Sequence, residues 1–209
     1  WMILDIALCV ATSSPWNGAP VDGGIVLYLA LEDTFHRLRE RTAALTSAPP
    51  PTLYSVTEWP SINDGAGIAA LDQWIAAHPG TKMIIIDTLQ RLRAGKASTY
   101  HRDYADSAKL KGIADAHGLA IVIIHHTRKG AIGANCSPLD TVSGSTGLTG
   151  AADAVLVLAS KANDGELWMT GRDIPQAVLP LHWDRSRWRI ANRPPALPQK
   201  AQCQIGYRP

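Results

Sequence analysis

The sequence is poor in the residues that mark several classes of protein. It contains three cysteines, which are widely spaced, and no C-x-x-C pair. This pattern excludes a disulfide-rich scaffold and a cysteine-based zinc site, and it is typical of a protein of the reducing cytosol. No apolar run approaches the roughly 18 residues that a membrane span requires. We therefore expect a cytoplasmic protein that does not enter a membrane.

Charged residues are also few, at 18% of the chain, whereas hydrophobic residues make up 46%. That balance excludes an intrinsically disordered chain. The formal net charge of +2 is too small to indicate a nucleic-acid partner without other signals. Because no linker divides the chain, we expect one domain over residues 1–192, followed by a Pro/Gln-rich tail over 193–209.

Continuous apolar runs alternate with helical patterns along the first part of the chain. The runs at 25–30, 83–87 and 119–125 are typical of strands that are buried on both faces. After a Gly/Ser/Thr-rich loop over 127–149, three short strand patterns predict an antiparallel extension. We therefore expect an α/β fold in which helices flank a mostly parallel sheet. Helices are predicted at 2–11, 33–45, 64–78 and 104–117, and further strands at 53–56, 154–159, 165–170 and 178–183.

Polar residues follow three of the buried strands. Glu32 and Asp33 come after the first, Asp87 ends the second, and His125 and His126 end the third. Because the carboxyl ends of parallel strands meet at one edge of a sheet, we expect these side chains to lie close together. Each also has a structural alternative, since acids are common where a helix begins and a histidine at a strand end is often structural. No ligand spacing indicates metal-binding histidines.

The strand that ends at Asp87 has the form of a Walker B motif. Four apolar residues precede the acid, and a hydroxyl residue, Thr88, follows it. An acid at that position can hold Mg²⁺, directly or through water, beside nucleotide phosphates. Glu32, at the tip of the preceding long strand, is a candidate general base that polarises an attacking water.

Four segments, taken in order, resemble a known family. They are Leu29–Asp33, Ile84–Leu89, Ile124–Gly130 and Gly171–Asp173. Together they are similar to the RepA-type hexameric replicative helicase ATPases of the RecA/DnaB-like P-loop NTPase superfamily, over roughly residues 1–190. The resemblance implies a RecA-like fold, hydrolysis of ATP with Mg²⁺, a homo-oligomeric ring, and single-stranded DNA in the central channel of the intact parent protein.

The resemblance also implies roles for the residues at the strand tips. Glu32 corresponds to the catalytic glutamate, and Asp87 corresponds to the Walker B aspartate that holds Mg²⁺. Either His125 or His126 corresponds to the sensor of the γ-phosphate.

Further residues of the resembling segments are expected to contact nucleotide. Asp33, Thr88 and Lys129 are placed in the nucleotide site, and Arg172 corresponds to an arginine that reaches the nucleotide of the neighbouring subunit. Such an arginine neutralises charge that develops on the transferred phosphoryl group. Without the family, a salt bridge from Arg172 to the adjacent Asp173 is an equally good interpretation.

The chain departs from the family in one respect, because no P-loop of the form G-x-x-x-x-G-K-[ST] is present. Gly95-Lys96-Ala97-Ser98 lacks the first glycine and the hydroxyl residue after the lysine, and it follows the Walker B motif. The helix at 2–11 resembles the helix that follows a P-loop. We therefore expect an N-terminally truncated domain without the P-loop strand. The resulting gap in the sheet would be closed by re-pairing, closed by another chain, or left open.

Two other functions are compatible with the sequence. The first is a hydrolase of another substrate class, in which the strand-tip residues act as acid, base or metal ligands. The second is a non-catalytic DNA-binding remnant with an R-x-R-x-R segment and two tryptophans, although such a segment is also typical of a solvated strand face. The first uses Glu32, Asp33, Asp87 and His125; the second uses Arg185, Arg187, Arg189, Arg193, Trp183 and Trp188.

Overall fold

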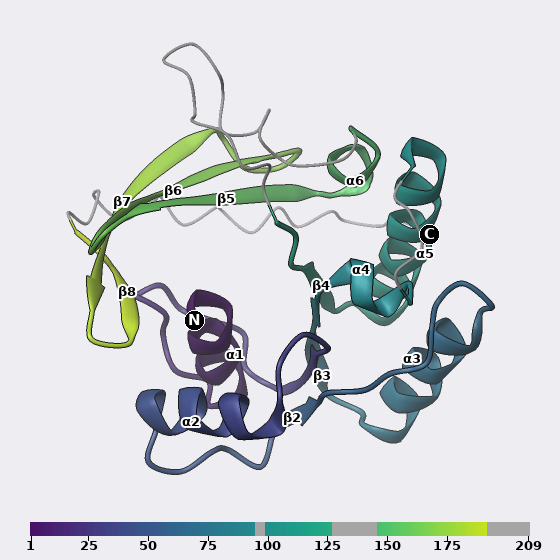
Figure 1. Ribbon diagram of the computed structural model, residues 1–209, viewed down its shortest axis with the longest axis horizontal. Coiled ribbons are helices and arrows are strands. Elements are labelled where there is room, and N and C mark those ends of the chain that lie inside the picture. The colour runs from purple at the N-terminus through teal and green to yellow at the C-terminus, as the bar shows by residue number, and fades with distance from the viewer. Residues whose placement is uncertain (95–98, 127–145, 192–209) are drawn as a thin grey trace, which may run out of the picture.

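The computed structural model describes residues 1–94, 99–126 and 146–191 (Figure 1). Four parallel strands form one sheet in the order β2-β1-β3-β4, and four antiparallel strands form a second sheet in the order β5-β6-β7-β8. The predicted α/β class, with a parallel sheet flanked by helices and an antiparallel extension, is confirmed. The strands are β1 (Ile25–Ala30), β2 (Leu53–Val56), β3 (Thr81–Asp87), β4 (Ala120–Ile123), β5 (Ala154–Lys161), β6 (Asp164–Gly171), β7 (Ala177–Asp184) and β8 (Arg187–Ile190).

Strands β1 and β3 lie at the centre of the parallel sheet and are buried on both faces. Alternate residues point to opposite faces, so Leu27 and Ile84 enter one hydrophobic cluster while Tyr28 and Ile85 enter the other. Helices α3 and α5 cover the first face, and α1 and α2 cover the second. The helices are α1 (Met2–Ala11), α2 (Phe35–Leu45), α3 (Ala66–Ala77), α4 (Leu89–Leu92), α5 (Tyr100–His117) and α6 (Thr146–Ala151).

Several element boundaries differ from those predicted. Helix α5 begins four residues early because Thr99 accepts a hydrogen bond from the backbone N–H of Arg102 and caps the helix. It ends at His117 and is followed by Gly118, whose φ of +62° favours glycine. Helix α6 occupies the end of the segment predicted as a loop, and α4 was not predicted because one helical turn has no periodic signature. The rest of that loop, residues 95–98 and the tail over 193–209 lie outside the described residues.

The segment with alternating arginines is solvated only in part, because Arg185 and Arg189 are exposed whereas Arg187 and Trp188 are not. Arg187 turns inward and contacts Asp5, and Trp188 is buried against Leu167 and Leu181. The prediction that these two side chains are available to DNA is therefore wrong. The pattern of alternating charge misleads here because the partner carboxylate lies 182 positions away in the chain.

No helix in the described part of the chain has the length and apolar character that crossing a membrane requires.

Candidate active site

The parallel sheet brings three strand ends together at one edge. Glu32 follows β1, Asp87 ends β3, and His126 follows β4, which pairs with β3. Thr88 Oγ1 donates a hydrogen bond to Glu32 Oε1 at 2.9 Å, and His126 Nε2 lies 3.4 Å from Glu32 Oε2. We call Glu32, Asp87, Thr88 and His126 the strand-tip site. His125 is half-buried at the same edge.

Glu32 is held in its ionised form by its neighbours. Partial burial raises the pKa of the Glu32 carboxyl, but the hydrogen bonds from Thr88 and His126 and the charges of His126 and Arg91 outweigh it and leave the pKa below its usual value. Arg91 Nε is 4.0 Å from Glu32 Oε1. Glu32 also lines an open pocket of about 420 Å³, so its carboxylate can reach a small molecule or a water.

Asp87 has the opposite environment. Burial raises the pKa of its carboxyl, as do the negative charges of Glu32 and Asp33, while a hydrogen bond from Tyr28 opposes the shift. Tyr28 Oη donates that bond to Asp87 Oδ2 at 2.9 Å. Two carboxyl groups whose pKa values are shifted in opposite directions at one sheet edge are typical of a site in which the two acids have different roles.

Asp33 is not open to a ligand in the way that Glu32 is. Its side chain is 7% exposed, and it forms salt bridges with Arg41 at 2.5 Å and Arg37 at 3.2 Å. Both arginines come from α2, which begins two residues after Asp33. The structure therefore places Asp33 beside the strand-tip site with its charge already neutralised.

The N-terminal end of α1 borders the same site. The charges of Asp87 and Asp33 act on the α-amino group of Trp1. Burial is the main cause of the lowered pKa of that amino group, followed by the positive charge of Arg41. Arg41, which pairs with Asp33, also lies 5.8 Å from the centre of the Trp1 ring, so the N-terminal end of α1 lies beside the acids.

The described residues contain no cluster of three or more His, Cys, Asp or Glu side chains that could hold a metal ion. Mg²⁺ does not require one, because it usually keeps several waters and takes one or two carboxylates together with substrate phosphates. Asp87 fits this mode: one of its oxygens accepts a hydrogen bond from the Tyr28 hydroxyl, and the negative charge of Glu32 favours a cation there.

Arg172 lies in a separate network, at the end of the antiparallel sheet where β5 begins and β6 ends. Its side chain is 57% exposed and reaches Asp153 at 3.5 Å and the carbonyl of Gly150 at 3.1 Å. Lys111 of α5 contacts the same Asp153 carboxylate at 2.8 Å. The structure thus does not bring Arg172 to the strand-tip site within one chain. Lys129 lies outside the described residues.

Tyr28 and Arg91 were not predicted from the sequence. A signal for Tyr28 exists, because it is the one residue with a polar group in an otherwise aliphatic buried strand, and a buried hydroxyl requires a partner. Arg91 had no comparable signal, since its position depends on the short helix α4.

The raised pKa of Asp87 predicts that Asp87→Asn stabilises the protein. A carboxyl whose pKa is higher in the folded than in the unfolded state weakens the fold once the pH rises through the folded pKa. The amide removes that charge and still accepts the Tyr28 hydrogen bond. We expect a gain of roughly 0.5–1 kcal/mol in the free energy of unfolding at pH 7, measured by urea denaturation.

The gain should disappear near pH 3, where Asp87 is protonated in both states. Asp115→Asn, an exposed acid on α5, is the matched control and should change the free energy of unfolding by less than about 0.5 kcal/mol. A pH-independent effect of Asp87→Asn would contradict the prediction.

Comparison with known proteins agrees with this geometry. A family model described as an AAA domain matches residues 1–131. Among solved structures, the crystal structure of the RadB recombinase is similar, with a TM-score of 0.54 and 14% sequence identity over 81% of this chain and 80% of that chain. This likeness shows a shared RecA-like fold. A search of curated protein sequences finds no match to the chain.

Proposed function

The chain belongs to the AAA-domain family, and we propose that its RecA-like ATPase domain is that of a RepA-type DNA helicase, with the strand-tip site hydrolysing ATP. The proposal depends on one observation. The ionised carboxylate of Glu32 lies with Thr88, His126 and Asp87 at the carboxyl ends of three neighbouring parallel strands. In open α/β sheets this edge is where nucleotides bind.

In this proposal Glu32 is the general base. Its carboxylate accepts a proton from the water that attacks the γ-phosphorus, and its lowered pKa keeps it ionised at neutral pH. Thr88 and His126 hold the two carboxylate oxygens in place, so that the base is oriented before the substrate arrives. His126 is therefore the better candidate for the phosphate sensor than His125.

Asp87 is the residue that would hold Mg²⁺, directly or through water, with the Tyr28 hydroxyl fixing the orientation of its carboxylate. Bound there, Mg²⁺ neutralises charge on the phosphates of ATP. The charge of the cation would also bring the pKa of Asp87 back down, because it favours the ionised carboxylate.

The RepA-type resemblance places a phosphate-binding loop immediately before the helix that corresponds to α1. Two features of the described residues support this placement. The N-terminal end of α1 lies near Asp87 and Asp33, and β4 and β5 are edge strands of separate sheets. We propose that the strand of the phosphate-binding loop fits between β4 and β5.

A ring of subunits around single-stranded DNA is the corresponding proposal for the assembled protein. Arg172 supports it, because its side chain is more than half exposed and lies away from the strand-tip site of its own chain. In a ring it would exchange Asp153 for the nucleotide of a neighbouring subunit.

Binding of Mg-ATP tests the proposal directly. We expect the 209-residue chain to bind Mg-ATP with a Kd in the millimolar range or weaker, because backbone N–H groups and a lysine of a P-loop supply most phosphate contacts. A chain extended by the residues encoded immediately before Trp1 should bind at roughly micromolar Kd and hydrolyse ATP. Isothermal titration calorimetry and phosphate release measure the two quantities.

Micromolar binding by the 209-residue chain would show that the described residues hold the phosphates without a P-loop. Absence of binding and hydrolysis in a folded extended chain would overturn the ATPase proposal.

A further inference from the structure

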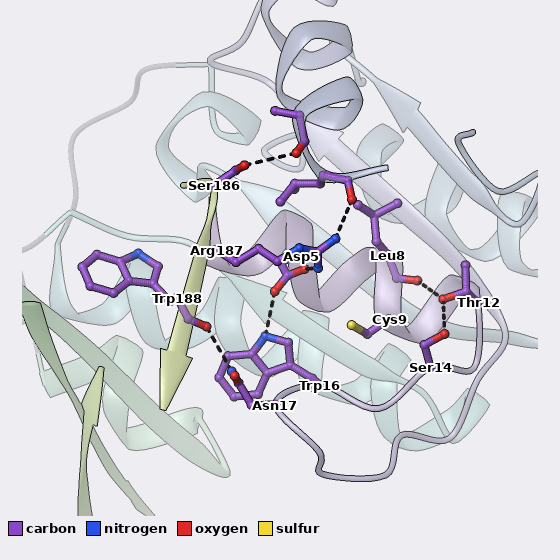
Figure 2. Close-up of polar contacts among 12 residues, drawn as sticks. Asp5, Leu8, Cys9, Thr12, Ser14, Trp16, Asn17, Ser186, Arg187 and Trp188 are labelled. Atoms are coloured by element: carbon purple, nitrogen blue, oxygen red, sulfur yellow. Dashed lines mark hydrogen bonds and ion pairs between the residues drawn. The ribbon is translucent and has the colours of Figure 1, made fainter. Parts of the chain in front are cut away.

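The tip of the β7–β8 hairpin packs against the two helices that border the strand-tip site. Arg187 comes from β8, yet its guanidinium contacts the carboxylate of Asp5 in α1 and donates to the carbonyl oxygen of Leu45 at the end of α2 at 2.5 Å (Figure 2). The neighbouring Ser186 Oγ donates to the carbonyl oxygen of Ala44 at 3.1 Å.

Asp5 depends on these contacts because it is 1% exposed. One carboxylate oxygen takes Arg187, and the other accepts a hydrogen bond from Trp16 Nε1 at 3.2 Å (Figure 2). A buried carboxylate without a partner is strongly unfavourable. Because separation of α1 from the hairpin would leave Asp5 without Arg187, the ion pair holds the two elements together.

The end of α2 depends on the hairpin as well. The last carbonyls of a helix have no partner within the helix, and a positive charge there is favourable. The last turn of α2, which the structure describes in full, contains no basic residue. Arg187 and Ser186 supply the missing donors from 142 positions further along the chain.

These contacts lie close to the strand-tip site. Asp5 is one helical turn from Trp1, whose α-amino group lies within the influence of Asp87 and Asp33. On α2, Arg41 precedes Leu45 by one turn, pairs with Asp33 and lies 5.8 Å from the centre of the Trp1 ring. The contacts of Arg187 on α1 and α2 are therefore each about one helical turn from a residue beside the strand-tip site.

We propose that Arg187 is a positioning residue. By joining Asp5 of α1 to the C-terminal carbonyls of α2, it determines where the ends of both helices lie relative to Asp33 and Asp87. Its importance for catalysis rests on the proposed function, whereas the positioning itself is a property of the protein without nucleotide.

The test uses the 209-residue protein and compares Arg187→Met with Arg187→Lys, and takes Arg189→Met as the matched control. Arg189 lies two residues further along β8 and is exposed. One readout is amide hydrogen exchange at 31–45 relative to Ile84–Ile86 of β3. The other is amide hydrogen exchange over Met2–Ala11 of α1, relative to the same strand.

We expect Arg187→Met to speed exchange at 31–45 and at Met2–Ala11 at least about tenfold more than at β3, because both helices lose the side chain that joins them. Arg187→Lys should keep the Asp5 pair and restore the exchange of α1, but not the exchange at the end of α2, because one ammonium group cannot span both partners.

The double variant Asp5→Leu with Arg187→Met keeps the test valid if Arg187→Met does not fold, since it leaves no buried charge unpaired. It should fold and still show the faster exchange at 31–45. Uniform acceleration at all amides, those of β3 included, would show that Arg187 supports overall stability only, and it would overturn the proposal. The same profile for Arg187→Met and Arg189→Met would overturn the proposal. Because neither readout involves ATP, both stand whether or not the proposed hydrolysis is observed.

Discussion

Replacing Glu32 by Gln is expected to lower kcat for ATP hydrolysis at least roughly 10²-fold, with little change in the Kd for Mg-ATP. A general base acts mainly in the transition state, so its loss slows turnover without weakening ground-state binding. The amide still accepts a hydrogen bond from Thr88, which keeps the side chain in place. The measurement is steady-state phosphate release by the upstream-extended chain, together with calorimetric binding of Mg-ATP.

Glu40→Gln is the matched control, because Glu40 is an exposed acid of α2 that pairs with His36. It should leave both kcat and Kd unchanged. If Glu32→Gln weakens binding as much as it slows turnover, Glu32 has a structural role, as the acid that precedes a helix.

The second large effect concerns stability and comes from α4. Arg93 ends this helix and is 3% exposed, with Nη1 donating to Asp103 at 2.7 Å and Nε donating to Asp106 at 2.8 Å. We expect Arg93→Met to lower the free energy of unfolding by about 3–5 kcal/mol, because it leaves the fully buried Asp103 without its cation. Urea unfolding followed by tryptophan fluorescence measures this change.

Arg91→Met is the control from the same helix, since that side chain is 66% exposed, and it should cost less than about 0.5 kcal/mol. Replacing Asp103 and Asp106 by Leu together with Arg93→Met should recover most of the loss, because no buried charge then remains unpaired. A loss below about 1 kcal/mol for Arg93→Met would contradict the reading of this cluster as a buried ion network.

The sequence was sufficient to predict the sheet edge at which the acids meet. Apolar runs that end in Glu32, Asp87 and His126 predict strands buried on both faces, and a buried parallel sheet places all its carboxyl ends on one side. That result depends on local patterns alone, which is why the fold class and the neighbourhood of these three residues could be predicted together.

Which of two adjacent side chains reaches a partner could not be predicted in the same way. His125 and His126 follow the same strand, and only the packed structure brings His126 to Glu32. The Tyr28 hydroxyl meets Asp87 because β1 and β3 pair in a register that no local pattern specifies. Each contact joins segments far apart in the sequence, where composition and spacing carry no information.

Contacts between distant segments also explain why two arginines of β8 differ in exposure. Arg187 and Arg189 are equivalent in the alternating pattern, yet one is drawn inward by the buried carboxylate of Asp5 while the other stays exposed. Sequence periodicity describes which face a residue occupies within its own element. Whether that face meets solvent or an unpaired charge is determined by how distant elements pack, and therefore only by the tertiary structure.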